Sequence, residues 1–175
     1  MNSERVKLVA LTLAALSLLV PIACGGDGGG GSTSPDEWAD SLCTELSTWR
    51  DSVAEAVGPV QGGGVSRQEL ENVANEVADA TEALVGGLQD LDRPDIEAGQ
   101  EAQDEIDRLA DELQTDIGEV DRAAESGSAN AARASLNTMT GQVSSAVQSL
   151  EQIDSQGELR SAFEQSDACR DLTRS

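Results

Sequence analysis

The residues with the most definite chemistry in this 175-residue chain are three cysteines, Cys24, Cys43 and Cys169. A cysteine thiolate can be alkylated, oxidised to a disulfide or bound to a metal. The other ionisable side chains are 33 Asp and Glu against 11 Lys and Arg, with no His, which gives a net charge of −22. Without imidazole the chain lacks the commonest general base and metal ligand, and a polyanion repels the phosphates of nucleic acid. The composition therefore excludes His-based chemistry and nucleic-acid partners.

The elements that must position these groups begin with an export signal. Arg5 and Lys7 precede an apolar run from Leu8 to Val20, which is the order of charged and apolar regions in a signal peptide. The 16 residues from Leu8 to Ala23 would span only about 24 Å as a helix, against a hydrocarbon core of about 30 Å. We therefore expect residues 1–23 to be a cleaved signal peptide.

The residues around the first cysteine are Val20-Pro21-Ile22-Ala23-Cys24-Gly25-Gly26. A small residue followed by Cys at the cleavage point resembles the lipobox of bacterial lipoproteins, although Pro21 stands where that family usually has Leu. In that family the Cys receives a diacylglyceryl thioether and becomes the new N-terminus. The resemblance implies that Cys24 is the lipid attachment site and that the protein is anchored on the extracytoplasmic face of the cell membrane. An uncleaved anchor, or secretion with an unmodified thiol, is the alternative.

Residues 24–34 follow as the lipidated Cys and a Gly/Ser-rich tether, a composition typical of flexible coil. Without residues 1–23 the chain loses Glu4, Arg5 and Lys7, which leaves 32 acids and nine Arg, a net charge of −23. This mature chain contains no Lys, His or Tyr. A Schiff-base lysine and a His-based triad are excluded, so we expect neither an enzyme nor a cofactor.

Residues 35–175 predict an acidic all-α domain, a small antiparallel bundle of four to five helices. Apolar residues recur every three or four positions, and Ser-x-x-Glu capping boxes precede three of these stripes. No period-two alternation is present, so no sheet is expected. The fourth helix carries a heptad seam, and Gly127 ends the third. The expected helix starts are Ser34, Ser66, Asp92 with Pro94, Ser128, and Ser155 with Glu158 as its capping partner.

Cys43 and Cys169 fall in the first and the last expected helix. Export favours oxidation of the two cysteines that remain once Cys24 is lipidated. Antiparallel packing of the terminal helices would place the pair at a common level. We therefore predict a Cys43–Cys169 disulfide, with two buried thiols as the alternative.

Two groups of side chains in the first and third helices suggest binding chemistry. Trp38 and Trp49 are eleven residues apart, nearly three helical turns, so they share one face; we expect core anchors, with a ligand platform as the alternative. The third segment holds twelve acids against Arg108 and Arg122. A solvated face is the expected interpretation and a cation site or basic partner the alternative. No stretch fits a calcium loop, so no metal site is predicted.

The fourth expected helix is nearly uncharged, with Arg133 as the only charge between Ser126 and Leu150. We interpret this neutrality as burial among the other helices. The alternative is an exposed neutral strip on which a partner docks, with Ser144 and Gln148 as candidate contacts. The remaining members of that strip are Asn137, Thr138 and Ser145.

Together these patterns predict a membrane-anchored, exported lipoprotein that serves as a non-enzymatic interaction or structural module at the cell envelope. Its expected partners are the membrane, through the lipid, and an envelope protein. The alternative function is capture of a small ligand or a cation between helices, by Trp38 or Trp49 with one or two carboxylates.

Overall fold

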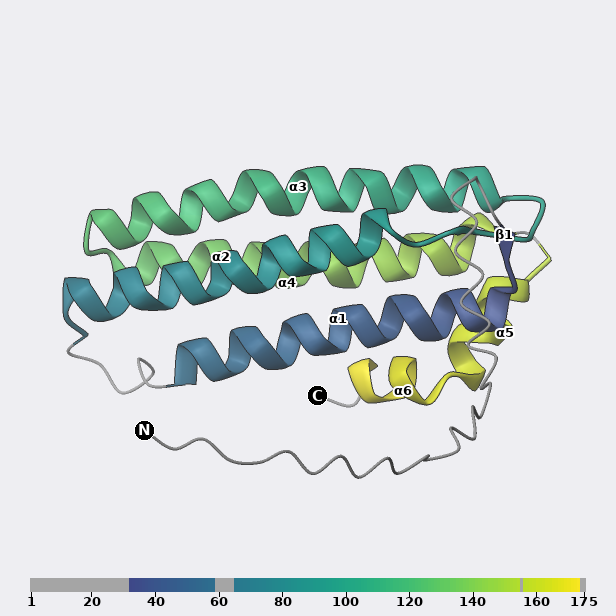
Figure 1. Cartoon of the computed structure of the whole chain (residues 1–175), viewed down its shortest axis with the longest axis horizontal. Coiled ribbons are helices and arrows are strands. Elements are labelled where there is room, and N and C mark those ends of the chain that lie inside the picture. The colour runs from purple at the N-terminus through teal and green to yellow at the C-terminus, as the bar shows by residue number, and fades with distance from the viewer. Residues whose placement is uncertain (1–31, 59–64, 155, 174–175) are drawn as a thin grey trace, which may run out of the picture.

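The computed structural model describes residues 32–58, 65–154 and 156–173, and within them the chain forms six helices and one pair of two-residue strands. The expected all-α bundle is confirmed (Figure 1). The expected signal peptide, Cys24 and most of the tether lie outside the described residues. In chain order the elements are β1 (Ser32–Thr33), α1 (Pro35–Val57), α2 (Arg67–Gln89), β2 (Arg93–Pro94), α3 (Gly99–Glu125), α4 (Ala129–Ile153), α5 (Glu158–Gln165) and α6 (Asp167–Thr173).

Capping side chains begin the first, second and fourth helices at the expected residues. The hydroxyls of Ser34 and Ser66 accept from the backbone N–H of Glu37 and Glu69, each at 3.3 Å. Glu69 completes a capping box, because its carboxylate accepts from the Ser66 N–H at 2.8 Å. The Ser128 hydroxyl accepts from the Ala131 N–H at 3.3 Å. These bonds satisfy backbone donors that have no partner within their helix.

The start of the third helix was predicted wrongly. Asp92 and Pro94 do not begin it; α3 starts at Gly99, and Arg93–Pro94 instead pairs in parallel with Ser32–Thr33. The ring of Pro94 disfavours helical backbone at Arg93, which holds this segment extended. The pairing also corrects the expectation of no sheet, and it assigns Ser32 and Thr33 to the folded domain rather than to the tether.

The last expected helix is divided in two. Ser155 lies outside the described residues, and α5 begins at Glu158 after Gly157, whose φ of 81° is left-handed. The chain becomes extended at Ser166, whose hydroxyl accepts from the Cys169 N–H at 3.3 Å and so caps α6. The expected apolar stripe of this segment is nevertheless buried; it comprises Leu159, Ala162, Phe163, Ser166 and Cys169.

The four long helices pack in sequence order, α1 on α2, α2 on α3 and α3 on α4, while α5 and α6 pack on α1 (Figure 1). One core of buried Leu, Ile, Val, Ala and Trp side chains runs between them. Helix α2 continues through Gly86 and Gly87 to Gln89, although two glycines lower helix propensity. No helix of the described residues is both long and apolar enough to cross a membrane.

Candidate functional site

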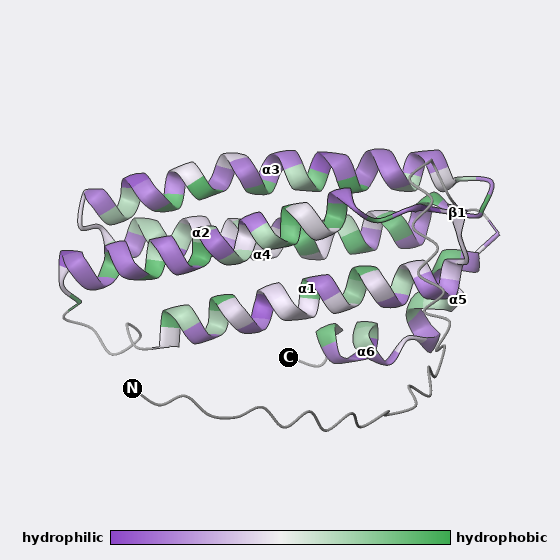
Figure 2. Ribbon diagram, viewed as in Figure 1, coloured by the Kyte–Doolittle hydropathy of each residue, from purple (hydrophilic) through white to green (hydrophobic). Residues whose placement is uncertain are grey.

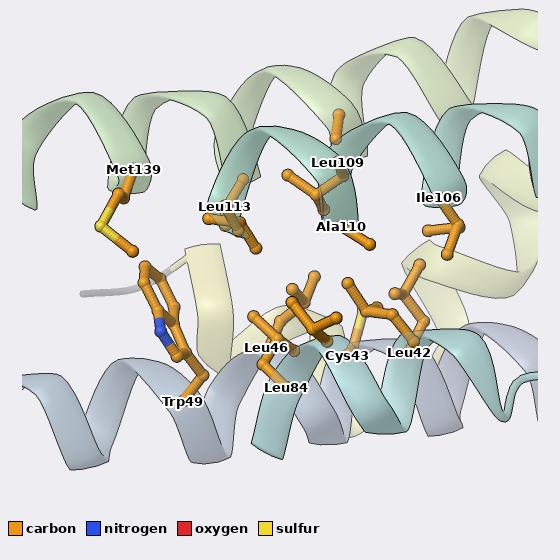
Figure 3. Packing of buried hydrophobic residues seen from close by; sticks show 14 of the residues in the cluster. Leu42, Cys43, Leu46, Trp49, Leu84, Ile106, Leu109, Ala110, Leu113 and Met139 are labelled. Carbon is orange, nitrogen blue, oxygen red and sulfur yellow. The ribbon is translucent and has the colours of Figure 1, made fainter. Parts of the chain in front are cut away.

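The bundle is least closely packed along the seam between α1 and α4. Each long helix packs along its neighbour in sequence, but among the described residues α1 and α4 have no such extended contact. At mid-level the gap is bridged by large side chains, with Met139 of α4 pointing towards Trp49 of α1 (Figure 3). Both side chains are buried. The core therefore stays closed while the outer part of the seam is left open.

Two cavities open along this seam. The larger, of about 700 Å³, lies between α4 and the α5–α6 segment; its lining is Cys43, Val143, Ser144, Val147, Gln148, Glu151, Phe163, Glu164, Cys169, Arg170 and Leu172. The smaller, of about 310 Å³, lies between α4 and the facing ends of α1 and α2; its lining is Val53, Val57, Leu70, Val73, Ala129, Ala132, Arg133, Leu136, Asn137 and Thr140. Both have apolar floors and polar rims, the composition common in binding sites.

The α4 residues that line the two cavities form one continuous face. Both sets recur at spacings of one, three and four from Ala129 to Glu151, which is the periodicity of a single helix face. The 23 residues from Ala129 to Glu151 correspond to about 33 Å of helix. On α1 the lining runs from Cys43 to Val57, about 21 Å. The two cavities therefore lie along one face of α4; we call the two cavities together with this face the α1–α4 groove.

Cys43 and Cys169 lie at disulfide distance, with the two Sγ atoms 2.01 Å and the two Cα atoms 5.0 Å apart. This agrees with the pairing predicted from the sequence. The bond joins α1 to α6 across 126 positions and lies in the wall of the larger cavity. The α5–α6 segment thus forms one side of the groove.

Two further contacts hold the α5–α6 segment to α1. The Ser166 hydroxyl donates to Oδ1 of Asp40 at 2.9 Å. The Arg50 guanidinium donates to the backbone carbonyls of Asp171 and Leu172 at 3.1 and 3.4 Å, so it caps the C-terminal end of α6. Sequence patterns did not reveal these contacts, because the partners are more than 120 positions apart.

Asp154 shapes the turn that starts this segment. Its carboxylate accepts from the backbone N–H of Gln156 at 2.9 Å and of Leu159 at 3.0 Å. Burial alone would raise the Asp154 pKa, but four backbone N–H donors, from residues 156–159, lower it below the ordinary value. Asp154 therefore caps the N-terminal end of α5, a role that the sequence analysis predicted for Ser155.

The two tryptophans lie inside the bundle and line neither cavity. Trp38 is fully buried and meets the Phe163 ring edge to face, with centroids 6.3 Å apart. Trp49 is buried and its indole N–H donates to the Thr81 hydroxyl at 3.0 Å. Their position agrees with core anchors, the interpretation favoured from their spacing.

The expected burial of the neutral face of α4 is wrong. All five residues of the strip are exposed: Asn137, Thr138, Ser144, Ser145 and Gln148. The hydroxyls of Thr138 and Ser144 donate to the carbonyls four residues before them, at 3.1 and 3.0 Å, so the face needs no protein neighbour to satisfy these groups. Ser144 and Gln148 line the larger cavity, whereas Thr138 and Ser145 line neither.

The acids of α3 are spread along its outer face, which Figure 2 shows as a nearly continuous hydrophilic surface. Asp116 is the buried exception. Its pKa is raised above the ordinary value, chiefly because burial disfavours the charged carboxylate. The nearby carboxylates of Glu119 and Glu112 also raise this pKa, whereas a hydrogen bond with Gln142 opposes the shift. In the part of the chain that the structure describes, no group of three or more Asp, Glu or Cys side chains is placed to hold a metal ion.

Comparison of the chain with protein-family models, with curated proteins and with solved structures finds no match. The fold and the site therefore define the class by themselves: an acidic helical bundle with an open seam between its first and fourth helices. A groove with an apolar floor and a polar rim is suited to binding.

Proposed function

We infer that the protein is an exported lipoprotein whose bundle is displayed on the extracytoplasmic face of the cell membrane by a lipid on Cys24. One observation carries this proposal: Ala23-Cys24-Gly25 follows a charged start and an apolar run that is too short to span a bilayer. The Gly-rich residues after Cys24 would give the domain freedom to reorient above the membrane.

At the membrane, the bundle serves as a non-enzymatic interaction module. The absence of Lys, His and Tyr from residues 24–175 supports this role, because these residues supply most general bases and many covalent nucleophiles. The exposed side of α4, where Arg133 is the one charge before Leu150, also supports it: a partner can approach there without crossing the acidic surface of α3. The partner is a protein of the cell envelope.

The anchor is tested by replacing the proposed acceptor. Cys24→Ala should leave the precursor uncleaved and without the diacylglyceryl group, and treatment of expressing cells with globomycin should also leave the precursor uncleaved; mass spectrometry of the purified protein reads both results. Gly28→Ala, a change in the same Gly-rich segment, serves as the matched control and should be processed normally. Cleavage of the Cys24→Ala protein at the same point as in the parent would overturn the proposal.

A further inference from the structure

A buried carboxyl links α3 with α4. Asp116 of α3 is only 8% exposed, and its side chain is hydrogen-bonded with that of Gln142 on α4. A charged carboxylate can only accept hydrogen bonds, so the amide nitrogen of Gln142 is the donor in this bond. The two helices, which pack along one another, are thus joined through a group that can gain or lose a charge.

Each partner of this bond also has one buried oxygen without a hydrogen-bond partner among the described residues: Oδ2 of Asp116 and Oε1 of Gln142. Buried acceptors are seldom left unpaired, because they have lost their bonds to water. These two oxygens cannot bond to each other as long as both only accept. A proton on Oδ2 satisfies both, since a neutral carboxyl donates one hydrogen bond and still accepts another.

We propose that Asp116 and Gln142 form a proton-operated latch between α3 and α4. With the proton in place, Oδ2 of Asp116 donates to Oε1 of Gln142, while the amide nitrogen donates to the other carboxyl oxygen. When the proton passes to solvent, the first of these bonds is lost, two oxygens are left unpaired and α4 is held less tightly. The latch goes beyond the proposed interaction role and does not depend on the anchor at Cys24.

The charged groups around the pair favour the protonated latch. On α3, Glu112 and Glu119 lie one helical turn before and after Asp116, and their carboxylates disfavour a third negative charge there. Helix α4 has no ionic side chain between Arg133 and Glu151. The ionic side chains of α2, the other long helix that packs on α3, are all exposed: Arg67, Glu69, Glu71, Glu76, Asp79 and Glu82.

The direction of the pH dependence follows from these surroundings. Burial, together with Glu112 and Glu119, raises the pKa of Asp116 above the ordinary value, which exceeds the opposing effect of the Gln142 N–H. The latch is therefore fully present below the pKa of the unfolded chain, and it is lost as pH rises through the pKa of the folded state. Acid closes the latch and neutral pH opens it.

The latch holds α4 at a point between the two cavities of the α1–α4 groove. Thr140, two residues before Gln142, lines the smaller cavity, and Val143, the next residue, lines the larger one. A change in how firmly α4 is held at Gln142 therefore reaches the walls of both cavities.

The first test isolates the acceptor role of Gln142. Carboxyl ¹³C NMR of the processed protein in detergent micelles follows the titration of Asp116, whose signal is assigned by its absence from Asp116→Asn. Gln142→Met keeps the length of the side chain without its polar atoms, and Gln148→Met makes the same change at an exposed position of α4. The latch predicts that the Asp116 pKa falls in Gln142→Met, because the protonated form loses two bonds, whereas the charged form loses one bond and one unpaired oxygen. Gln148→Met should leave this pKa unchanged.

The second test measures the hold on α4 and needs no change at Gln142. Asp116→Asn imitates the closed latch, since an amide both donates and accepts. Hydrogen exchange of the α4 amides, corrected for the intrinsic effect of pH, gives the equilibrium constant for local opening. Between pH 3 and pH 7 this constant should rise about tenfold more in the parent than in Asp116→Asn. Circular dichroism checks that each variant is folded.

A raised Asp116 pKa in Gln142→Met would overturn the proposal, because it would mean that Gln142 only donates to the carboxylate. An unchanged pKa in that variant would also overturn it. Equal rises of the opening constant in the parent and in Asp116→Asn would show that the proton on Asp116 does not hold α4.

Discussion

Removing the Cys43–Cys169 disulfide should destabilise the domain more than any other small change in it. The bond closes a loop of 126 positions, and the chain-entropy model gives about 5 kcal/mol for a loop of this length. The total stability of a domain this size is about 5–15 kcal/mol. The apolar core consists mostly of Ala and Leu and includes few aromatic rings, so the cross-link makes up a large share of that total.

The structure also indicates where the loss appears first. Without the bond, the α5–α6 segment is held to α1 by side-chain contacts such as Ser166 with Asp40 and Arg50 with the end of α6. Local opening then costs less than global unfolding. We expect the amides of residues 158–173 to lose their protection from hydrogen exchange before those of α2 and α3.

Urea denaturation of Cys43→Ala/Cys169→Ala, followed by circular dichroism, should show a free energy of unfolding lower by about 3–5 kcal/mol than that of the parent. Cys24→Ala is the matched control and should unfold like the parent. A difference below about 1 kcal/mol between the double variant and the parent would refute the argument, as would two freely alkylated thiols in the unreduced parent.

Three further predictions concern buried polar groups. Thr81→Val leaves the Trp49 indole N–H without its acceptor and should cost about 1–3 kcal/mol in urea denaturation; no loss would contradict the role of this bond. Asp154→Ala removes a carboxylate whose pKa is lowered in the folded state, so its stabilisation is present above the unfolded pKa and lost as pH falls through the folded value. The variant should melt below the parent at pH 7, and the gap should shrink in acid. Asp116 has a raised pKa, so its charge costs stability as pH rises through that value. Asp116→Asn should raise Tm at pH 7 and have little effect near pH 3; the opposite order would contradict this account.

Local patterns in the sequence predicted most of the helices. Ser34, Ser66 and Ser128 cap helices where expected, since a cap and the stripe that follows it are determined within a few residues. The start of the third helix was predicted wrongly because Pro94 was interpreted as a proline of the first helical turn. In the structure Pro94 instead holds Arg93 in an extended conformation, and the two residues pair with Ser32 and Thr33. That pairing joins segments about 60 positions apart, beyond the reach of a local pattern.

The groove could be predicted only in part. Ser144 and Gln148 were singled out because α4 has so few charges, and they do line the larger cavity. Burial of this face was nevertheless expected, since neutrality alone does not distinguish a packed helix from an exposed one. The open seam depends on α4 packing along α3 rather than α1, and on α6 lying against α1. Both are properties of the whole bundle, so no single stripe of residues could reveal them.

Membrane anchoring through Cys24 is the central claim, and the mature N-terminus tests it most directly. Mass spectrometry of the protein purified from the membranes of expressing cells should find Cys24 as the first residue, bearing a diacylglyceryl thioether, with residues 1–23 removed. An N-terminus upstream of residue 24, or an unmodified Cys24 thiol in the mature chain, would contradict the account.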